Sequence, residues 1–167
     1  VPEPLLRRES TPVERIDDDL RRLAQDMLAT MYEAPGVGLA AVQVAVPRRL
    51  IVVDITKPDE PARNPIVMVN PRVVETIGDD LRMYEEGCLS IPDVYAEVER
   101  PAMVKVTYTD LAGRDQELVC EQMMATVLQH EIDHLDGKLF IDFLSKLRRD
   151  RIIKKLVKAK RDSAEVF

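Results

Sequence analysis

The sequence predicts an α+β protein with antiparallel sheets. One amphipathic helical pattern opens the chain, and short strand-like runs follow it, separated by turns and loops rather than by helices. Strands that succeed one another in this way are typical of antiparallel pairing. The length of 167 residues and the hydrophobic content of 46% suit one domain with its own core, and we expect residues 1–167 to form it.

The first predicted helix carries apolar side chains at helical spacing, which indicates one face packed on a core. Three aspartates at 17–19 are typical of a helix start, and Pro35 with Gly36 is typical of a helix end. Although two methionines belong to this stripe, we interpret it as core rather than as a ligand groove. The stripe consists of Leu20, Leu23, Ala24, Met27, Leu28 and Met31.

Short runs rich in branched apolar residues predict the strands. Gly113 lies within 110–115, between the last two runs, and this segment predicts a hairpin turn. The stretch 57–64 holds two prolines and several charges, and we expect it to be a surface loop. The predicted strands are 50–55, 66–70, 73–77, 103–109 and 116–120.

The only two histidines of the chain, His130 and His134, lie four positions apart, and Glu131 lies beside the first. On a helix, residues four apart share a face, so both imidazoles can reach one metal ion. Glu131 could then accept a proton from water at that metal. The alternative is an inert, hydrogen-bonded pair of buried histidines. The apolar surroundings favour the metal, because burying these polar groups is costly unless something compensates them.

A catalytic metal site usually has three protein ligands and one open position, so a third ligand is needed. The metzincin pattern has its glycine here, Gly137, but Phe140 occupies the place of its third histidine. A thermolysin-like site requires a downstream glutamate, and only Glu165 near the end of the chain qualifies. Neither class of protease fits well.

An upstream cysteine is the better candidate. Cys88 follows Gly87 in a polar segment that we expect to bend, and its thiolate would complete a Cys-His-His set. A free cysteine is more often a small buried apolar residue. Cys120 suits that interpretation, because it lies in an alternating, strand-like run. We therefore prefer Cys88 as the ligand.

A third segment, 34–43, is rich in glycine and alanine and ends at Gln43. It lacks the lysine and the glycine spacing of nucleotide-binding loops. Small residues there allow the backbone to approach another element or a bound peptide closely. Gln43 could be an ordinary polar loop residue, or its amide could donate to a developing oxyanion.

These three segments together resemble the peptide deformylase family. That family is marked by G-x-G-x-A-A-x-Q, E-G-C-x-S and Q-H-E-x-D-H-x-x-G in this order, and the motifs stand here at 36–43, 86–90 and 129–137. The resemblance spans nearly the whole chain. One departure is Tyr95, which occupies a position where some relatives carry arginine.

The resemblance implies antiparallel sheets packed around a central helix that carries the H-E-x-x-H motif, followed by a C-terminal helix. It implies a metal-dependent hydrolase that removes the N-formyl group from the formylmethionine of newly synthesised polypeptides and releases formate. Cys88, His130 and His134 would hold one divalent ion. Thiolate and imidazole suit several metals. The resemblance favours Fe²⁺ in the cell, with Zn²⁺, Ni²⁺ or Co²⁺ in purified protein.

The resemblance also implies the roles of further residues. Glu131 would be the general base, and the Gln43 side chain with the backbone N–H of Leu89 would hold the oxyanion. We interpret Glu86, Arg100 and Asp133 as supporting groups rather than catalysts. The peptide would bind as an added strand along Val37, Gly38 and Leu39. The expected methionine pocket consists of Val37, Tyr84, Glu86, Met123, Thr126 and Val127, of which Thr126 is less apolar than expected.

Charge is unevenly distributed along the chain. Residues 145–161 carry nine Lys and Arg against one Asp, a local charge of +8, whereas the whole chain is −6 and the remainder is therefore −14. The stretch also has an apolar stripe, so it predicts an amphipathic helix on the core. Its basic face could bind RNA phosphates without reading sequence. In the family, the C-terminal helix of some bacterial members docks on the ribosome, and we expect such contact here as a hypothesis.

Other features limit the location of the protein. No segment reads as a signal peptide, no apolar run is long enough to span a membrane, and two cysteines provide no disulfide framework. We therefore expect the cytoplasm. Two other functions stay open: a metallo-endopeptidase and a non-catalytic ribosome-binding or RNA-binding module. The absence of a downstream ligand argues against the first. A ligand set of three rather than four argues against a purely structural zinc site.

Overall fold

The structure, a computed structural model, describes residues 4–57 and 59–165, with the side chains of 163–165 excepted. Helices and strands are mixed along the chain, and every pairing between two named strands is antiparallel. The α+β prediction is therefore confirmed. The helices are α1 (Asp18–Glu33), α2 (Gln122–Leu135) and α3 (Lys146–Glu165), with short 3₁₀ helices η1 (Pro4–Arg7), η2 (Ala41–Val44) and η3 (Phe140–Phe143). The strands are β1 (Gly38–Ala40), β2 (Leu50–Val53), β3 (Ile66–Thr76), β4 (Leu81–Cys88), β5 (Ile91–Pro101), β6 (Met103–Thr109) and β7 (Asp115–Glu121).

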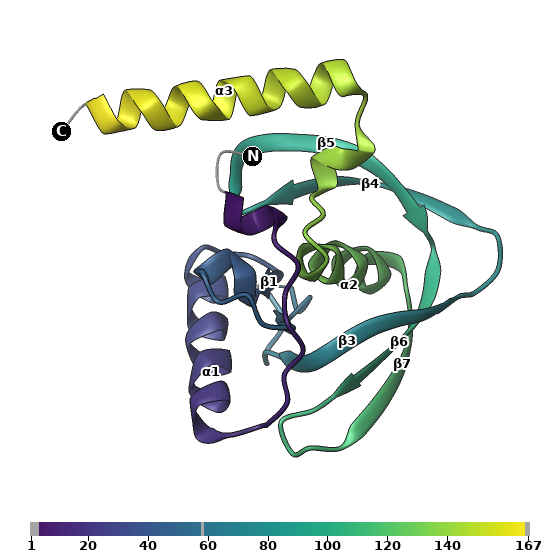
Figure 1. The fold of residues 1–167 in the computed structure, drawn as a ribbon. Helices are drawn as coiled ribbons and strands as arrows, with labels where there is room; N and C mark the ends of the chain where they lie inside the picture. The colour runs from purple at the N-terminus through teal and green to yellow at the C-terminus, as the bar shows by residue number, and fades with distance from the viewer. Residues whose placement is uncertain (1–3, 58, 166–167) are drawn as a thin grey trace.

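The strands form two antiparallel sheets around α2. The larger sheet has the order β1-β2-β3-β6-β7, and β4 pairs with β5 in a separate two-stranded ribbon. Helix α2 contacts strands of both sheets, and in Figure 1 the β4–β5 ribbon arches over it. This arrangement is the predicted one, with the H-E-x-x-H helix at the centre.

Helices cover both faces of the larger sheet. Ile51 and Val53 of β2 pack in a hydrophobic cluster with side chains of α2. Leu50 and Val52 pack in a second hydrophobic cluster, the α1 cluster, with side chains of α1. Because side chains alternate between the faces of a strand, a strand covered on both sides is apolar at every position. This explains why every residue of β2 is apolar.

The first helix begins and ends close to the predicted residues. The carboxylate of Asp17 accepts a hydrogen bond from the N–H of Leu20 and caps α1, and Ala34 follows its last turn. All the stripe residues lie in the α1 cluster: Leu20, Leu23, Ala24, Met27, Leu28 and Met31. The prediction that this stripe is core is confirmed.

Several strands differ from the predicted runs. The predicted strand 50–55 ends at Val53, because the buried Asp54 carboxylate instead accepts hydrogen bonds from Tyr32 Oη and the N–H groups of Thr56 and Asn64. The runs 66–70 and 73–77 form one strand, β3, which continues through Asn70 with a local irregularity. The β6–β7 hairpin follows the prediction, and the described residues of the loop 57–64 are exposed.

β4 and β5 have no counterpart among the strands predicted from the sequence. Charged residues are spread through both strands, so no apolar run stands out, although Ala96 and Val98 are buried. The bend expected near Cys88 is the turn at Leu89 and Ser90 between these two strands.

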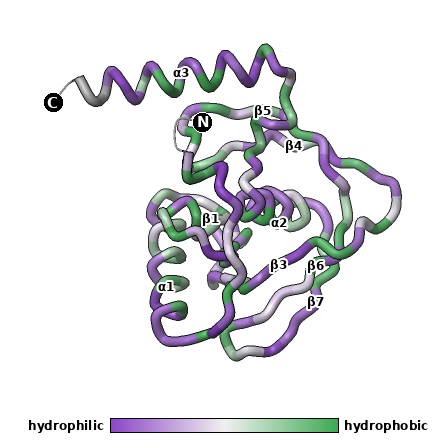
Figure 2. Tube along the Cα trace, in the orientation of Figure 1, coloured by the Kyte–Doolittle hydropathy of each residue, from purple (hydrophilic) through white to green (hydrophobic). Residues whose placement is uncertain are grey.

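The chain after α2 packs on the ribbon. The turn at Gly137 has φ +73°, and a Cβ there would lie 2.4 Å from the carbonyl oxygen of Arg7. Glycine is therefore required at this turn for structural reasons, although its position also matches the metzincin pattern. Helix α3 runs across the top of the molecule in Figure 1, and hydrophobic and hydrophilic residues alternate along it in Figure 2. Its residues Ile152, Ile153 and Leu156 pack against the cluster that contains Phe140. No described helix has the length and apolarity needed to cross a membrane.

Candidate functional site

Helix α2 places the predicted chemical groups in the interior. His130, Glu131 and His134 are exposed by 8%, 5% and 1%, and the two imidazole centroids lie 5.0 Å apart. The two histidines share one helix face because they are four residues apart, and Glu131 is three residues from His134. The helix can be buried all round because it packs between the two sheets.

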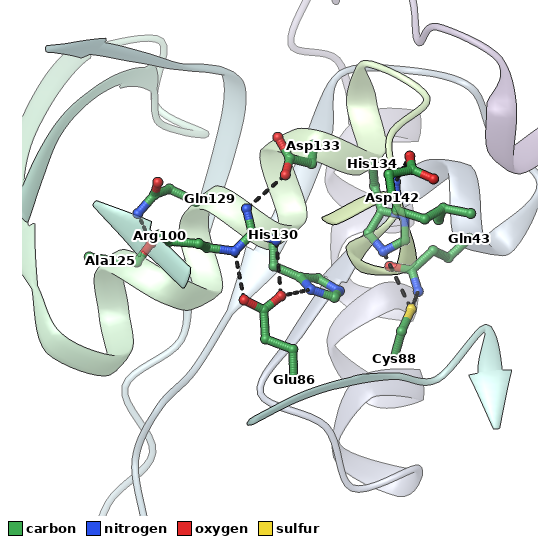
Figure 3. A network of polar contacts seen from close by, with 11 residues as sticks. Gln43, Glu86, Cys88, Arg100, Ala125, Gln129, His130, Asp133, His134 and Asp142 are labelled. Carbon is green, nitrogen blue, oxygen red and sulfur yellow. Dashed lines mark hydrogen bonds and ion pairs between the residues drawn. The ribbon is translucent and has the colours of Figure 1, made fainter. Parts of the chain in front are cut away.

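Strand β4 brings the predicted cysteine to the two histidines. Cys88 Sγ lies 3.4 Å from His134 Nε2, and the ligand atoms of Cys88, His130 and His134 all lie within 4.8 Å of one another. Figure 3 shows the sulfur beside the His134 ring. Cys120 lies buried in β7, where its Sγ contacts the Val104 carbonyl, and burial raises its pKa to about 11. It is a core residue, as expected, and Cys88 is the cysteine of the cluster.

The cluster has the properties of a site for one divalent cation. Among the described residues, His134 Nδ1 and Glu131 Oε2 are buried without a hydrogen-bond partner. Burial lowers the pKa of His134 to about 3, so its imidazole is neutral, as a metal ligand must be. Burial lowers the pKa of His130, but contacts with Cys88 and Glu86 raise it to about 10 on balance, which indicates surroundings that favour positive charge.

The donor atoms also suit such an ion. One thiolate and two imidazoles are ligands for Zn²⁺, Fe²⁺, Co²⁺ and Ni²⁺, and three protein ligands leave an open position for water or substrate. Glu165, considered above as a distant ligand, ends α3, and its side chain lies outside the part of the chain that the structure describes.

A buried ion pair orients the first histidine. Glu86 Oε1 lies 2.9 Å from His130 Nδ1, and both Glu86 oxygens accept hydrogen bonds from Arg100, at 2.6 and 2.9 Å. Burial raises the pKa of Glu86, but hydrogen bonds from His130 and Arg100 outweigh it and lower that pKa. Arg100 also donates to Asp133 at 2.8 Å (Figure 3). Because Nδ1 of His130 is held in this way, its Nε2 is left to face the cluster.

Glu131 lies against the edge of the larger sheet. A Cβ at Gly38 would lie 2.8 Å from Glu131 Oε1, so only glycine lets β1 approach the carboxylate this closely. Burial raises the pKa of Glu131 to about 7, against the lowering effect of the His130 charge. A general base works best with a pKa near the operating pH.

The amide of Gln43 is fixed beside Cys88. Its Oε1 accepts a hydrogen bond from the N–H of Ala40, and its Nε2 lies 3.0 Å from Ser90 Oγ and 3.4 Å from Cys88 Sγ. This contact of Ser90 was not predicted from the sequence. The signal that could have found it is its place as the serine of the E-G-C-x-S motif.

A cavity of about 440 Å³ opens next to this cluster and includes Gln43, Cys88, Leu89, His130 and Glu131 in its walls. Most of the predicted substrate residues line it: Val37, Gly38, Tyr84, Glu86, Met123, Thr126 and Val127. Leu39 does not line the cavity, but its predicted contact with the peptide is through the backbone and stays a prediction. Because side chains alternate along β1, Leu39 faces the opposite side from Gly38 and is buried under α1.

Part of the cavity wall was not foreseen. Where Gly87 pairs with Tyr95 and Cys88 with Ile91, three residues of β5 bulge out of the pairing. This bulge, residues 92–94, lines the cavity together with Tyr95. Bulges occur often next to active sites, but register irregularities leave no sequence pattern that reveals them.

A buried H-E-x-x-H helix, whose two imidazoles face a thiol at an open cavity, defines a hydrolase with a candidate metal site. Residues 1–150 match the family described as polypeptide deformylase. The chain belongs to this family, and the resemblance inferred from the three motifs is confirmed.

The relatives match this chain over almost their whole length. A peptide deformylase of Rhizobium meliloti (strain 1021) is 58% identical over 159 residues, which cover 95% of this chain and 90% of that protein. One of Mesorhizobium japonicum is 58% identical over 98% of this chain and 92% of its own length. A crystal structure of the Ehrlichia chaffeensis peptide deformylase in complex with actinonin has a TM-score of 0.89 and 38% identity, and covers 96% of this chain and 95% of its own.

Family membership establishes the class of reaction. Peptide deformylases are enzymes that remove the N-formyl group from nascent polypeptides, and the family uses a single metal ion. The chain is therefore a hydrolase of this family, and neither a metallo-endopeptidase nor a purely structural binding module describes it.

Proposed function

We propose that Cys88, His130 and His134 hold one divalent metal ion and that Glu131 is the general base of deformylation. The observation that carries this proposal is the convergence of three ligand atoms within 4.8 Å beside a buried carboxylate, at the wall of a cavity. When bound, such an ion supplies Lewis acidity, which lowers the pKa of water and polarises a carbonyl oxygen.

The protein groups perform the proton transfers. Glu131 accepts a proton from the attacking water, whose oxygen bonds to the formyl carbon. Glu131 then returns that proton to the nitrogen as the C–N bond breaks, and formate and a free α-amino group leave. A carboxylate whose pKa is raised by burial to about 7 can both take and return a proton near neutral pH.

Two donors would hold the oxyanion that forms between these steps: the Gln43 amide and the backbone N–H of Leu89. The support for Gln43 is its fixed orientation, since Ala40 holds its oxygen and directs Nε2 towards Cys88. Leu89 directly follows Cys88 and lines the same cavity. Loss of one such donor typically lowers kcat by about 10² to 10³.

The methionine side chain would occupy the cavity beside Tyr84, Met123 and Val127. The peptide backbone would add a strand to β1, which is the edge strand of the larger sheet and pairs only with β2 among the described strands. An edge strand presents unpaired N–H and C=O groups, which an extended peptide can satisfy. In this arrangement Leu39 contributes its backbone only.

The finer assignments are also proposals. We infer Fe²⁺ as the metal in the cell, with Zn²⁺, Ni²⁺ or Co²⁺ in purified protein, because thiolate and imidazole accept all four. We infer a reducing cytoplasm, because Cys88 and Cys120 are both unpaired and a thiolate ligand needs protection from oxidation. Residues 1–167 are proposed to act as one catalytic unit.

Formate release from formyl-Met-Ala-Ser tests the proposal. We expect one formate per peptide, no cleavage between the amino acids, loss of activity after metal removal by a chelator, and recovery after anaerobic addition of Fe²⁺. Metal content is measured alongside. Activity that survives complete metal removal would contradict the assignment of Cys88, His130 and His134.

Helix α3 is proposed to contact the ribosome through charge. Its exposed side carries a shallow hollow surrounded by Arg151, Lys154, Lys155, Val157, Lys158 and Arg161. The opposite side packs on the core through Ile152, Ile153 and Leu156. Such a basic surface binds RNA phosphates without reading sequence, in a way that salt weakens.

Neutralising Lys154, Lys155 and Lys158 with glutamine is expected to weaken co-sedimentation with ribosomes several-fold at low salt and to flatten its salt dependence. Deformylation of a free peptide serves as the internal control for folding. Ribosome binding equal to that of the unmodified protein would refute the contact.

A further inference from the structure

A buried carboxylate outside the metal cluster joins the end of α1 to the loop after β2. Asp54 directly follows β2, is 4% exposed, and accepts a hydrogen bond from Tyr32 Oη. It also accepts hydrogen bonds from the backbone N–H groups of Thr56 and Asn64, at 2.9 and 3.1 Å. None of these residues takes part in the proposed deformylation mechanism.

The two side chains are in the protonation states that their hydrogen bond needs. Burial and the contact with Asp54 raise the pKa of Tyr32 to about 12, so the hydroxyl keeps the proton that it donates. Burial raises the pKa of Asp54, but hydrogen bonds from Thr56 and Tyr32 outweigh it and lower that pKa, so the carboxylate is charged near neutral pH. Hydrogen bonds to a charged group are stronger than those between neutral groups. We call Tyr32 and Asp54 the clamp pair.

The clamp pair holds both ends of one wall of the cavity. Tyr32 lies one residue before the end of α1, and its side chain binds the Asp54 carboxylate. Further along the chain, the Val37 carbonyl accepts a hydrogen bond from the backbone N–H of Asp54 at 2.9 Å. The wall segment, residues 33–37, is therefore tied at each end to the same buried residue. Three of its residues line the cavity: Pro35, Gly36 and Val37.

The wall segment borders the places where the peptide is proposed to bind. It leads directly into β1, the edge strand to which the peptide would add. A Cβ at Gly36 would lie 3.1 Å from Cδ1 of Leu89, so the segment also meets the side chain of the residue proposed to hold the oxyanion. A displacement of the wall segment would therefore change both the width of the cavity and the line of β1.

We propose that Tyr32 and Asp54 are positioning residues for the peptide, because together they hold the wall segment in the place that peptide binding requires. This inference rests on the proposed function, since it concerns the same cavity. A wall that is ordered before the peptide arrives reduces the ordering that binding must accomplish. The proposed metal ligands and general base lie on β4 and α2 rather than on the wall segment, so the clamp pair acts on peptide binding and not on the chemical step.

Tyr32→Phe tests the hydrogen bond alone, because phenylalanine keeps the ring that the Arg63 guanidinium covers at 3.9 Å. We expect KM for formyl-Met-Ala-Ser to rise by roughly threefold to tenfold, with kcat and metal content nearly unchanged. Kinetics of formate release and metal analysis measure these quantities. A purely structural role of the hydroxyl would lower the free energy of unfolding but leave the KM of the folded protein unchanged.

Asp54→Asn and the double variant show whether the two residues act as a pair. Asparagine keeps the size of the side chain but replaces one acceptor oxygen with an NH₂ group, so KM should rise at least as much as in Tyr32→Phe. In the double variant, KM should be close to that of Asp54→Asn alone, because effects that act through one shared contact do not add.

Amide hydrogen exchange, measured without peptide, locates the change in the structure. The N–H of Gly36 donates to the Met31 carbonyl at 2.7 Å, and the N–H of Asp54 donates to Val37. In Tyr32→Phe both should exchange several-fold faster, whereas the N–H groups of α2 should keep their rates. Such a pattern would show local release of the wall segment rather than general unfolding.

Two variants are matched controls. Asn70→Asp removes the amide that donates to the Val13 carbonyl at 2.9 Å and thus loosens a different segment. Tyr108→Phe removes a tyrosine hydroxyl from β6, next to the hydrophobic cluster that includes side chains of α2. Asn70→Asp is expected to lower the free energy of unfolding, and both variants are expected to keep the KM of the unmodified protein.

The outcomes separate this inference from the proposed function. Unchanged KM values in Tyr32→Phe and Asp54→Asn would overturn the clamp pair and leave deformylation intact. An equal rise of KM in Asn70→Asp would also overturn it, since any lost tether would then have the same effect. A lower kcat at unchanged KM would assign the pair to the chemical step and overturn it as well. No formate from the unmodified protein would overturn the proposed function and this inference together.

Discussion

Glu131→Gln is expected to lower kcat for deformylation by about a thousandfold or more, because general acid–base catalysis typically contributes about 10² to 10⁴ and glutamine cannot accept the proton. Glutamine has nearly the same size, so it fits between α2 and Gly38, where a Cβ on that glycine would come within 2.8 Å of the carboxylate. The substitution thus removes the base without reshaping the cavity. Formate release under saturating peptide measures the effect.

Metal content and unfolding provide the control for this variant. Glutamine is neutral, and burial already disfavours the charged form of Glu131, so stability should not fall. We expect the variant to bind one metal per chain through Cys88, His130 and His134, as is proposed for the unmodified protein. A variant with full metal content that kept a tenth of the activity would show that another group accepts the proton.

The chemistry of α2 could be inferred from the sequence because its signal is local. The two histidines and Glu131 lie within five residues, and helical geometry alone puts the two histidines on one face. The apolar stripe of α1 was predictable for the same reason. In both segments the interactions that matter follow the period of a single helix, so no knowledge of distant pairing was needed.

The ribbon could not be inferred in this way. β4 and β5 carry charges on both faces, because their inner face holds the Glu86–Arg100 pair and their outer face holds Glu85 and Glu97. The alternation of apolar and polar residues that identifies a strand is therefore absent. Their pairing is visible only when the chain is folded, and with it the bulge at 92–94 that forms one cavity wall.

For the same reason, the sequence indicates that Glu86 and Arg100 support the site but not which contacts they make. Glu86 and Arg100 were expected to support the site, but Glu86 was also expected in the methionine pocket. Its carboxylate reaches the cavity wall, yet both oxygens are engaged by His130 and Arg100. Contacts between residues 44 and 14 positions apart depend on the arrangement of α2 under the ribbon, which no local pattern specifies.

Arg100→Met is expected to lower the free energy of unfolding of the metal-loaded protein by about 3–5 kcal/mol, because removing one partner of a buried ion pair leaves the other charge uncompensated. The side chains of Arg100 and Glu86 are only 4% and 3% exposed, so water cannot replace the lost partner. Metal affinity should also fall, by about 10-fold to 100-fold, since Glu86 would no longer be held where it orients His130. Urea unfolding and competition with a chelating indicator measure the two effects.

A second variant and a surface pair distinguish this explanation from a general loss of packing. Adding Glu86→Gln to Arg100→Met removes the stranded charge, while the glutamine oxygen can still accept from His130 Nδ1, so the double variant should recover much of the lost stability. Arg7→Met breaks the pair with Asp142, whose side chains are 37% and 27% exposed, and should cost only about 1 kcal/mol. Two results would contradict this explanation: an equal loss of unfolding free energy in Arg7→Met and Arg100→Met, or a double variant no more stable than Arg100→Met alone. In either case the buried charge is not what makes Arg100 necessary, and the orientation of His130 must depend on packing instead.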